Sequence, residues 1–231
     1  LRAEAWHGTE LVKMIRTYQP DIILNNRLEV SGEGFGSLME ESPKSTSGDF
    51  VSPEQIIPPD GIRNYAGETV PWEACVTMNG HWGFCRDDRY FKPADMLIRK
   101  LVECVSKDGN LLLNIGPDET GDIPVESVRI LEEIGDWMKV NGESVYGCGY
   151  TGIVKPEYGR ITGNRDTLYY HVMEGQIGGV LLNGIKREAI ASVELLCGKK
   201  ISVSDSWITS NYPEYVFADL GEDPVLPDHT D

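Results

Sequence analysis

Two short apolar runs separated by a helix-length segment constrain this fold more than any other feature of the chain. The first is Trp72–Met78, which is followed by Asn79-Gly-His-Trp-Gly-Phe84, and the second is Asn110–Ile115. Residues 93–107 between them form an amphipathic pattern, with Pro93 at the start and Gly109 after the end. A strand, a helix and a second strand in this order predict a parallel βαβ unit, and therefore an α/β fold.

The side chains that follow these two runs point to a carbohydrate site. Asn79, His81 and Trp82 come directly after the first run, and Asn114 closes the second. A (β/α) barrel carries its chemistry at the carboxyl ends of its strands, so we expect these residues at one edge of the sheet. An aromatic ring beside amides and an imidazole suits a sugar, which has apolar C–H faces and a rim of hydroxyl groups. Asn79 and Asn114 are expected to satisfy backbone groups rather than to contact a ligand.

The acidic composition restricts the partners. The chain carries 37 acidic and 21 basic residues, which gives a formal net charge of −16. Such a field repels phosphate groups, so we expect no nucleic acid and no anionic membrane as a partner. No apolar run approaches the roughly 18 residues of a membrane-spanning helix.

The five cysteines are widely spaced and include no Cys-x-x-Cys pair, so a zinc site is not expected. Cys75 and Cys104 lie within apolar runs and are expected to be small buried hydrophobic residues. A disulfide between Cys75 and Cys85 is an open alternative at this stage.

Hydrophobic periodicity divides the rest of the chain into helices, a long loop and a β-rich region. Residues 5–18 and 124–141 carry apolar side chains at helical spacing, and Asp21–Asn25 has the pattern of a short buried strand. Residues 28–70 are rich in Gly, Ser and Pro, which predicts a long loop. After Gly147, short alternating runs predict a small β-sandwich, with strands at 160–161, 167–173, 178–182, 191–196, 200–203 and 215–220.

Three ordered blocks of sequence carry a resemblance to a known family. They are Trp72-Glu-Ala-Cys-Val-Thr-Met-Asn-Gly-His-Trp-Gly-Phe84, the run from Leu97 to Gly109-Asn-Leu-Leu-Leu-Asn-Ile-Gly-Pro117, and Gly135-Asp-Trp-Met-Lys-Val-Asn-Gly-Glu-Ser-Val-Tyr-Gly147. In this order and spacing, residues 5–150 resemble the α-L-fucosidases of glycoside hydrolase family 29. The residues after 150 resemble, more loosely, the β-domain that follows the barrel in that family.

The resemblance implies a partial (β/α)8-type barrel over residues 1–147 and a C-terminal β-sandwich over residues 148–231. A complete barrel takes about 250 residues. Only the three strands proposed above, at 21–25, 72–78 and 110–115, precede the β-rich region. The sequence is therefore expected to represent the C-terminal part of a longer enzyme. The family's nucleophile, an aspartate at the end of a strand, is expected upstream of residue 1.

The activity implied by the resemblance is retaining exo-hydrolysis of terminal α-L-fucose from oligosaccharides or glycoconjugates. A fucosylated glycan is the expected substrate, and no metal or other cofactor is expected. The family is secreted, periplasmic or lysosomal, so such a location is expected for the parent enzyme.

Glu54 is the first candidate for the acid/base of such a reaction. It ends the block Gly48-Asp-Phe-Val-Ser-Pro-Glu54, which resembles a family block that follows an Asn-x-Arg strand end and carries the acid/base. Retaining glycosidases use two carboxyl groups about 5–5.5 Å apart, one as nucleophile and one as acid/base. Glu73 is the second candidate, because the Trp72-Glu73 pair is also a feature of the family.

Three further residues have roles implied by the resemblance. Arg27, at the end of the predicted strand 21–25, is expected to orient the nucleophile carboxylate and keep it ionised. Trp82 is expected to form a platform for the C5 methyl group and apolar face of fucose. His81 departs from the small residue often found at its position, and it either bonds a sugar hydroxyl in the aglycone region or faces solvent.

Two other functions fit the same sequence. The first is carbohydrate binding by the β-region, for which aligned exposed aromatic residues would be the evidence, with candidates Tyr158, Tyr169, Tyr170, Trp207, Tyr212 and Tyr215. The second is a different retaining glycosidase on the same barrel, because a fold does not fix a substrate.

Overall fold

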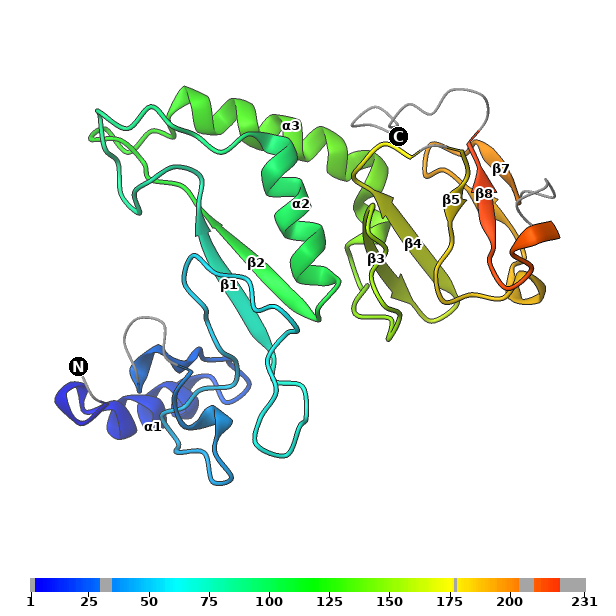
Figure 1. Cartoon of the computed structure of the whole chain (residues 1–231). Coiled ribbons are helices and arrows are strands. Elements are labelled where there is room, and N and C mark those ends of the chain that lie inside the picture. Colours follow the sequence, from blue (N-terminus) through cyan, green and yellow to red (C-terminus); the bar gives the residue numbers. More distant parts are fainter. Residues whose placement is uncertain (1–2, 30–34, 177, 204–209, 221–231) are drawn as a thin grey trace. The chain divides into compact units, whose positions relative to one another are not determined.

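The computed structural model describes residues 3–29, 35–176, 178–203 and 210–220 (Figure 1). The chain forms two compact units, which are described separately. The N-terminal unit comprises residues 1–92 and 107–127, and the C-terminal unit comprises residues 93–106 and 128–231. None of the described helices is long and apolar enough to cross a membrane.

The N-terminal unit begins with a short 3-10 helix η1 (Ala3–Trp6) and helix α1 (Gly8–Tyr18). The predicted helix over residues 5–18 is confirmed from Gly8 onward. Arg16 near the end of α1 donates to both carboxylate oxygens of Asp49, at 2.8 and 2.7 Å. Asp49 also accepts from the backbone N–H of Leu24 at 2.7 Å. Its carboxylate therefore binds both the end of α1 and the segment that follows α1.

Strands β1 (Trp72–Thr77) and β2 (Gly109–Asn114) form the parallel pair that the sequence predicted. Trp72 lies opposite Gly109 in this register, and its side chain is almost fully buried. A Cβ atom at position 109 would lie 2.1 Å from the indole ring, so only glycine leaves room for the tryptophan. The indole Nε1 also donates to the Lys107 carbonyl at 3.2 Å, which fixes the ring over the start of β2.

Residues 50–55 form a third segment that pairs in parallel with β1, through isolated bridges, within the region predicted as a loop. Val51 pairs with Trp72, and Glu54 pairs with Cys75. Four backbone hydrogen bonds of 2.8–2.9 Å join the segment to β1 and to the residue before it. The loop prediction is therefore wrong here. It failed because Pro53 lacks the N–H of a regular strand residue, and because the hydrogen-bonding partners lie some 20 residues away.

The predicted strand Asp21–Asn25 is reduced to one bridge, between Asn25 and Phe50. Gly48 lies directly against this bridge with a positive φ of 78°, and a Cβ atom there would be 2.3 Å from the Asn25 carbonyl oxygen. The chain then forms the short 3-10 helices η2 (Asn26–Leu28) and η3 (Gly36–Met39). The order of parallel segments is therefore Asn25, residues 50–55, β1 and β2.

The C-terminal unit contains helix α2 (Ala94–Val105) and most of helix α3 (Val125–Asn141), both close to their predicted bounds. The 3-10 helix η4 (Gly142–Ser144) follows α3, and η5 (Arg187–Ala189) lies in the β-rich region. Strands β3 (Gly159–Asn164) and β4 (Thr167–Val172) form an antiparallel hairpin. A four-stranded antiparallel sheet has the order β5 (Val180–Leu181), β8 (Phe217–Asp219), β7 (Lys200–Val203) and β6 (Val193–Glu194). All six predicted runs contain a strand.

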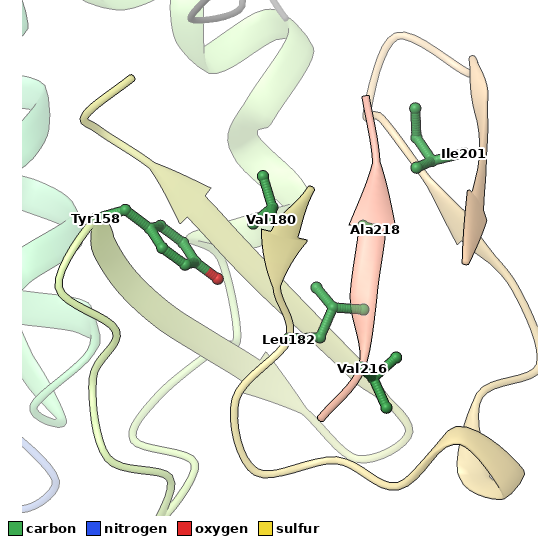
Figure 2. Close-up of a cluster of buried hydrophobic side chains, with 6 residues drawn as sticks. All are labelled: Tyr158, Val180, Leu182, Ile201, Val216 and Ala218. Carbon is green, nitrogen blue, oxygen red and sulfur yellow. The ribbon is translucent and has the colours of Figure 1, made fainter. Parts of the chain in front are cut away.

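The core of the β-rich region is a cluster of six buried side chains, which Figure 2 shows: Tyr158, Val180, Leu182, Ile201, Val216 and Ala218. The Tyr158 hydroxyl donates to the Leu181 carbonyl at 2.6 Å, and the Tyr170 hydroxyl donates to the Asn183 carbonyl at 2.6 Å. Burial raises the pKa of both phenols, that of Tyr170 to about 12. These tyrosines are therefore structural members of the core.

All five cysteines are free thiols, so the Cys75–Cys85 disulfide is not formed. Cys104 is fully buried, as predicted, while Cys75 is only partly buried. Cys75 belongs to the side of β1 that is less covered, whereas Trp72, Ala74 and Val76 are buried on the other side.

His171 in β4 is a partly buried imidazole that is held in its neutral form. The Thr162 hydroxyl donates to the Ser144 carbonyl at 2.7 Å, so it accepts from His171 Nε2 at 2.9 Å. Burial lowers the pKa of His171 to about 4. An unfolded histidine has a pKa of about 6.5. As the pH falls, the unfolded chain therefore binds a proton at this residue before the folded chain does.

This shift predicts a loss of stability in acid. The contribution of His171 is fully present above pH ~6.5 and is lost as the pH falls towards 4, by up to about 3 kcal/mol. His171→Gln keeps a donor for Thr162 but does not titrate, so its free energy of unfolding should fall less over this window. Urea unfolding of both proteins at pH 7 and pH 4.5 measures the difference. Equal losses in the two proteins would show that His171 is not the responsible group.

Candidate active site

The structure brings together two predicted site residues that are 27 positions apart. Arg27 Nη1 donates to Glu54 Oε2 at 2.9 Å, and Arg27 Nη2 donates to the Ser52 carbonyl at 2.9 Å. The two charged side chains are each about one-third exposed, at 29% and 32%. The guanidinium is thus tied both to the carboxylate and to the backbone of the segment that carries it, which restricts the carboxylate's orientation.

Two consecutive asparagines place Arg27 beside this segment. The Asn25 side chain accepts from the Arg27 backbone N–H at 3.1 Å and so begins η2. Asn26 is fully buried, and its side-chain oxygen accepts from the Ser52 backbone N–H at 3.0 Å. Asn26 was not among the predicted site residues. Its only signal in the sequence is an amide directly after an apolar run.

Glu54 and Glu73 lie on the same face of the parallel sheet. Glu54 is opposite Cys75, and alternation along β1 puts Glu73, Cys75 and Thr77 on one side. Glu73 is two residues earlier on β1, so it lies roughly 6–7 Å further from the carboxyl end. Burial raises the pKa of Glu73. Glu54 is therefore the candidate nearer the carboxyl end of the strands, and Glu73 lies deeper along them.

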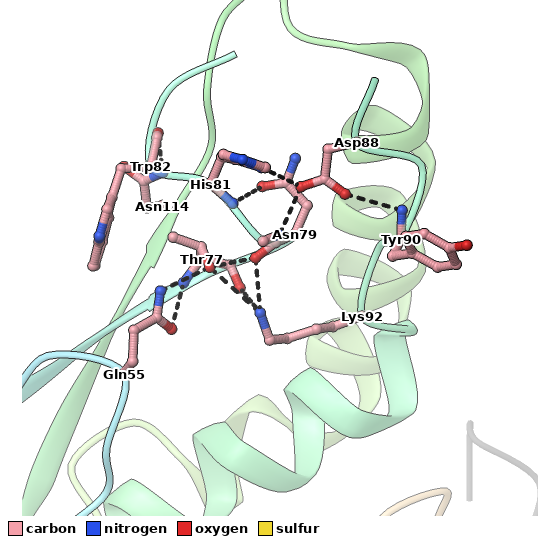
Figure 3. A network of polar contacts seen from close by, with 10 residues as sticks. Gln55, Thr77, Asn79, His81, Trp82, Asp88, Tyr90, Lys92 and Asn114 are labelled. Carbon is pink, nitrogen blue, oxygen red and sulfur yellow. Dashed lines mark hydrogen bonds and ion pairs between the residues drawn. The ribbon is translucent and has the colours of Figure 1, made fainter. Parts of the chain in front are cut away.

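The chain leaving β1 is held by Lys92, as Figure 3 shows. Lys92 Nζ donates to the Thr77 carbonyl at 2.7 Å and to the Asn79 carbonyl at 3.0 Å. Burial lowers the pKa of Lys92. The buried Thr77 hydroxyl donates to the Asn79 carbonyl and accepts from Gln55 Nε2 at 2.9 Å. Neither Lys92 nor Gln55 was predicted, because a lysine and a glutamine in polar segments carry no distinctive pattern.

Asp88 organises the loop that carries His81. One of its carboxylate oxygens accepts from the Gly80 backbone N–H and faces His81 Nδ1, both at 2.8 Å, and the other accepts from the Tyr90 N–H at 3.1 Å (Figure 3). The hydrogen bond with His81 and those from the backbone hold the pKa of Asp88 below its usual range. The Asp88 side chain is only 5% exposed, whereas that of His81 is 56% exposed. His81 is therefore an accessible ring with one nitrogen already engaged.

Trp82 is a partly exposed ring at the end of the sheet, with 40% of its surface accessible. The Asn114 side chain, at the end of β2, donates to the Trp82 carbonyl at 2.7 Å. The Asn79 side chain accepts from the His81 backbone N–H at 3.3 Å. Both amides therefore satisfy backbone groups, as predicted, and they shape the turn that presents the tryptophan.

An open hollow lies beside His81 and is lined by polar and aromatic side chains of the same loop, including Asn79, Asp87, Asp88, Tyr90 and Lys92. Among the described residues, no group of three or more His, Cys, Asp or Glu side chains is arranged to hold a metal ion. The chemical resources of this edge are thus a carboxylate with an arginine, an accessible imidazole, and an exposed indole. This set suits a sugar with an acid/base group beside it.

Known proteins that are similar to this chain are α-L-fucosidases. A plasma α-L-fucosidase of Rattus norvegicus is 31% identical over 147 residues, which are 61% of this chain and 28% of that protein. An α-L-fucosidase of Branchiostoma floridae is 32% identical over 160 residues, 62% of this chain and 34% of that protein. This chain therefore spans about a third or less of these curated relatives.

Solved structures extend the likeness beyond these matches. The α-L-fucosidase isoenzyme 1 of Paenibacillus thiaminolyticus is 42% identical with a TM-score of 0.89, and the match covers 99% of this chain and 53% of that one. A family 29 α-L-fucosidase of Bacteroides thetaiotaomicron, captured as a covalent intermediate, shares the fold at 22% identity, with a TM-score of 0.72 over 94% of this chain and 50% of that one.

The family model described as alpha-L-fucosidase matches residues 1–143, which is more than half of the 231 residues. Its match contains the Arg27–Glu54 pair, the parallel strands and the loop with His81 and Trp82. The resemblance seen in the sequence blocks is thereby confirmed, and the chain belongs to the α-L-fucosidase family.

Proposed function

We propose that this chain is part of a retaining α-L-fucosidase that removes terminal α-L-fucose from oligosaccharides or glycoconjugates. The observation that carries the proposal is the Arg27–Glu54 ion pair at the carboxyl end of parallel strands, in a chain of the α-L-fucosidase family. The proposed substrate is a fucosylated glycan. The Bacteroides fold relative was captured with a fucosyl fluoride, which is in keeping with this substrate class.

The proposed setting of the site is a (β/α)8-type barrel, to which residues 1–147 contribute the C-terminal part, with a β-sandwich over residues 148–231. The order of parallel segments, from Asn25 through residues 50–55 to β1 and β2, supports a barrel wall. Leu112 of β2 lies on the same face as Glu54 and is 42% exposed. An apolar side chain on this face suits the packed interior of a barrel.

Glu54 is the proposed acid/base. In the first step it would protonate the leaving glycosidic oxygen, and in the second it would remove a proton from the attacking water. The nucleophile is expected to be an aspartate outside this sequence. Arg27 would orient Glu54 through the contact at 2.9 Å, and its predicted contact with the nucleophile remains a prediction.

Trp82 and His81 are the proposed sugar contacts. The exposed indole offers an apolar face for the C5 methyl group and C–H face of fucose. The His81 ring is held through Nδ1 by Asp88 and stays accessible, which supports the proposal that it bonds a hydroxyl of the aglycone.

The alternative role, carbohydrate binding by the β-region, finds less support. Tyr158 and Tyr170 are members of the core, and Tyr169 directs its hydroxyl to Glu143 at 3.3 Å. Tyr212 and Tyr215 are about half exposed, but their rings are tilted by 56° at 6.3 Å and form no flat platform. Trp207 lies outside the described residues. A different glycosidase specificity is disfavoured by the family membership.

The proposal predicts that the 231-residue chain alone does not turn over an aryl α-L-fucoside, because the nucleophile is expected outside it. The assay compares the pure chain with its Glu54→Ala variant. Release of the aryl group by the unmodified chain above the level of the variant would contradict this expectation.

Replacing Glu54 in the full-length gene product that carries this sequence tests its role. Glu54→Ala should slow hydrolysis of fucosides with poor leaving groups by about 10²–10⁴-fold, because these leaving groups need a proton in the transition state. Fucosides with very acidic leaving groups should be cleaved with less loss in the first step, and azide should accelerate the second step. Glu73→Ala is the control. If Glu73→Ala shows this pattern and Glu54→Ala does not, the acid/base is Glu73.

Truncation of Trp82 separates binding from folding. Trp82→Ala should reduce kcat/KM for fucosides by a factor that corresponds to about 1–3 kcal/mol of lost apolar contact, with little change in melting temperature. Trp72→Ala is the matched control, since Trp72 is buried and its loss should cost about 3–5 kcal/mol of stability. A large drop in melting temperature for Trp82→Ala, with kcat/KM unchanged, would remove Trp82 from the site.

A further inference from the structure

Gln55, the residue after Glu54, adopts an unusual backbone conformation. Its φ is +57°, in the left-handed region that few non-glycine residues occupy. Such conformations persist only where the surroundings fix them, and they cluster at functional sites. At this position the chain leaves its pairing with β1, so the conformation of Gln55 sets where the paired segment ends and where the Glu54 side chain begins.

Three hydrogen bonds hold Gln55 in this conformation, all of them to β1. Its backbone N–H donates to the Cys75 carbonyl at 2.8 Å. Its side-chain Nε2 donates to Thr77 Oγ1 at 2.9 Å, and its Oε1 accepts from the Thr77 N–H at 3.4 Å (Figure 3). The primary amide suits this task, because it offers a donor and an acceptor to the hydroxyl and the N–H of one residue.

Thr77 is itself fixed from the opposite side. Thr77 is 1% exposed, and its hydroxyl donates to the Asn79 carbonyl. Lys92 Nζ donates to the Thr77 carbonyl at 2.7 Å. Gln55, which directly follows the proposed acid/base, is therefore bonded to the buried end of β1, and through Thr77 it is linked to the start of the loop with His81 and Trp82. Within the described part of the chain, Glu54 is otherwise restrained by its side-chain contact with Arg27 and by its backbone pairing with β1.

We propose that Gln55 is a positioning residue for Glu54, which fixes the carboxyl group for proton transfer by clamping the backbone to Thr77. This proposal rests on the proposed role of Glu54 as acid/base. A displacement of about 1 Å of a catalytic group can cost about 100-fold in rate. Loss of the clamp should therefore affect the proton-transfer steps more than substrate binding.

The test uses two variants at position 55 in the full-length gene product. Gln55→Gly accepts the left-handed backbone without strain but removes the clamp, and Gln55→Asn keeps the amide on a side chain one methylene shorter. Both should lower kcat about 10- to 100-fold for fucosides with poor leaving groups, with KM changed little. Both should also lose less rate with acidic leaving groups, so the dependence of rate on leaving-group pKa becomes steeper. A purely structural role would lower all substrates alike.

A partner variant and a control make the result specific. Thr77→Val removes the hydroxyl that binds Gln55 and should steepen the same dependence, while Thr77→Ser should restore it. The effects of Gln55→Asn and Thr77→Val should be less than additive, because both substitutions break the same hydrogen bond between Gln55 and Thr77. Asp108→Gly is the control, since Asp108 also has a left-handed backbone, with φ +58°, and precedes β2 outside this network. It should leave the leaving-group dependence unchanged.

The outcomes separate this proposal from the function on which it rests. If Glu54→Ala steepens the leaving-group dependence but Gln55→Gly and Gln55→Asn do not, Gln55 has no positioning role and the acid/base assignment stands. If Glu54→Ala does not steepen it, the acid/base assignment fails and the role of Gln55 fails with it. Should Gln55→Gly not fold, Gln55→Asn and Thr77→Val decide the matter by the same criterion.

Discussion

The parallel pairing of residues 50–55 with β1 is the constraint on which the candidate site depends. It fixes Glu54 opposite Cys75 and turns the carboxylate towards the less covered face of the sheet. It also presents the Ser52 carbonyl to Arg27, whose guanidinium then reaches Glu54 at 2.9 Å. Without this pairing the acid and the arginine would belong to separate polar segments with no reason to meet.

Charged side chains stabilise this edge by binding backbone groups as well as one another. Lys92 donates to two carbonyls at the end of β1, Asp88 accepts from two backbone N–H groups of the following loop, and Arg27 donates to one carbonyl. Exposed ion pairs alone contribute little to stability, but backbone groups at strand ends need partners. The same charges therefore both complete the strand ends and hold His81 in place.

The elements with strong local patterns were the ones that sequence reasoning found. Helices α1, α2 and α3 and the six strands of the β-rich region lie close to their predicted bounds, because their apolar spacing repeats over several residues. The β1–β2 pair was found for the same reason. The segment 50–55 was missed, since Pro53 and its flanking serine read as a loop while its strand-like geometry comes from β1.

The sequence by itself determined the family, the parallel strands and the list of candidate residues. These depend on residue types and their spacing, which can be read directly from the amino-acid sequence. It named Glu54, Arg27, Trp82 and His81 as candidates, and their roles remain predictions. It also predicted that the two strand-end asparagines bind backbone groups, and both hydrogen bonds are present in the structure. Only the tertiary structure decided that Arg27 contacts Glu54 and that Gln55 is clamped to Thr77. Those contacts join residues more than 20 positions apart, and their geometry follows from strand register, which no local pattern encodes.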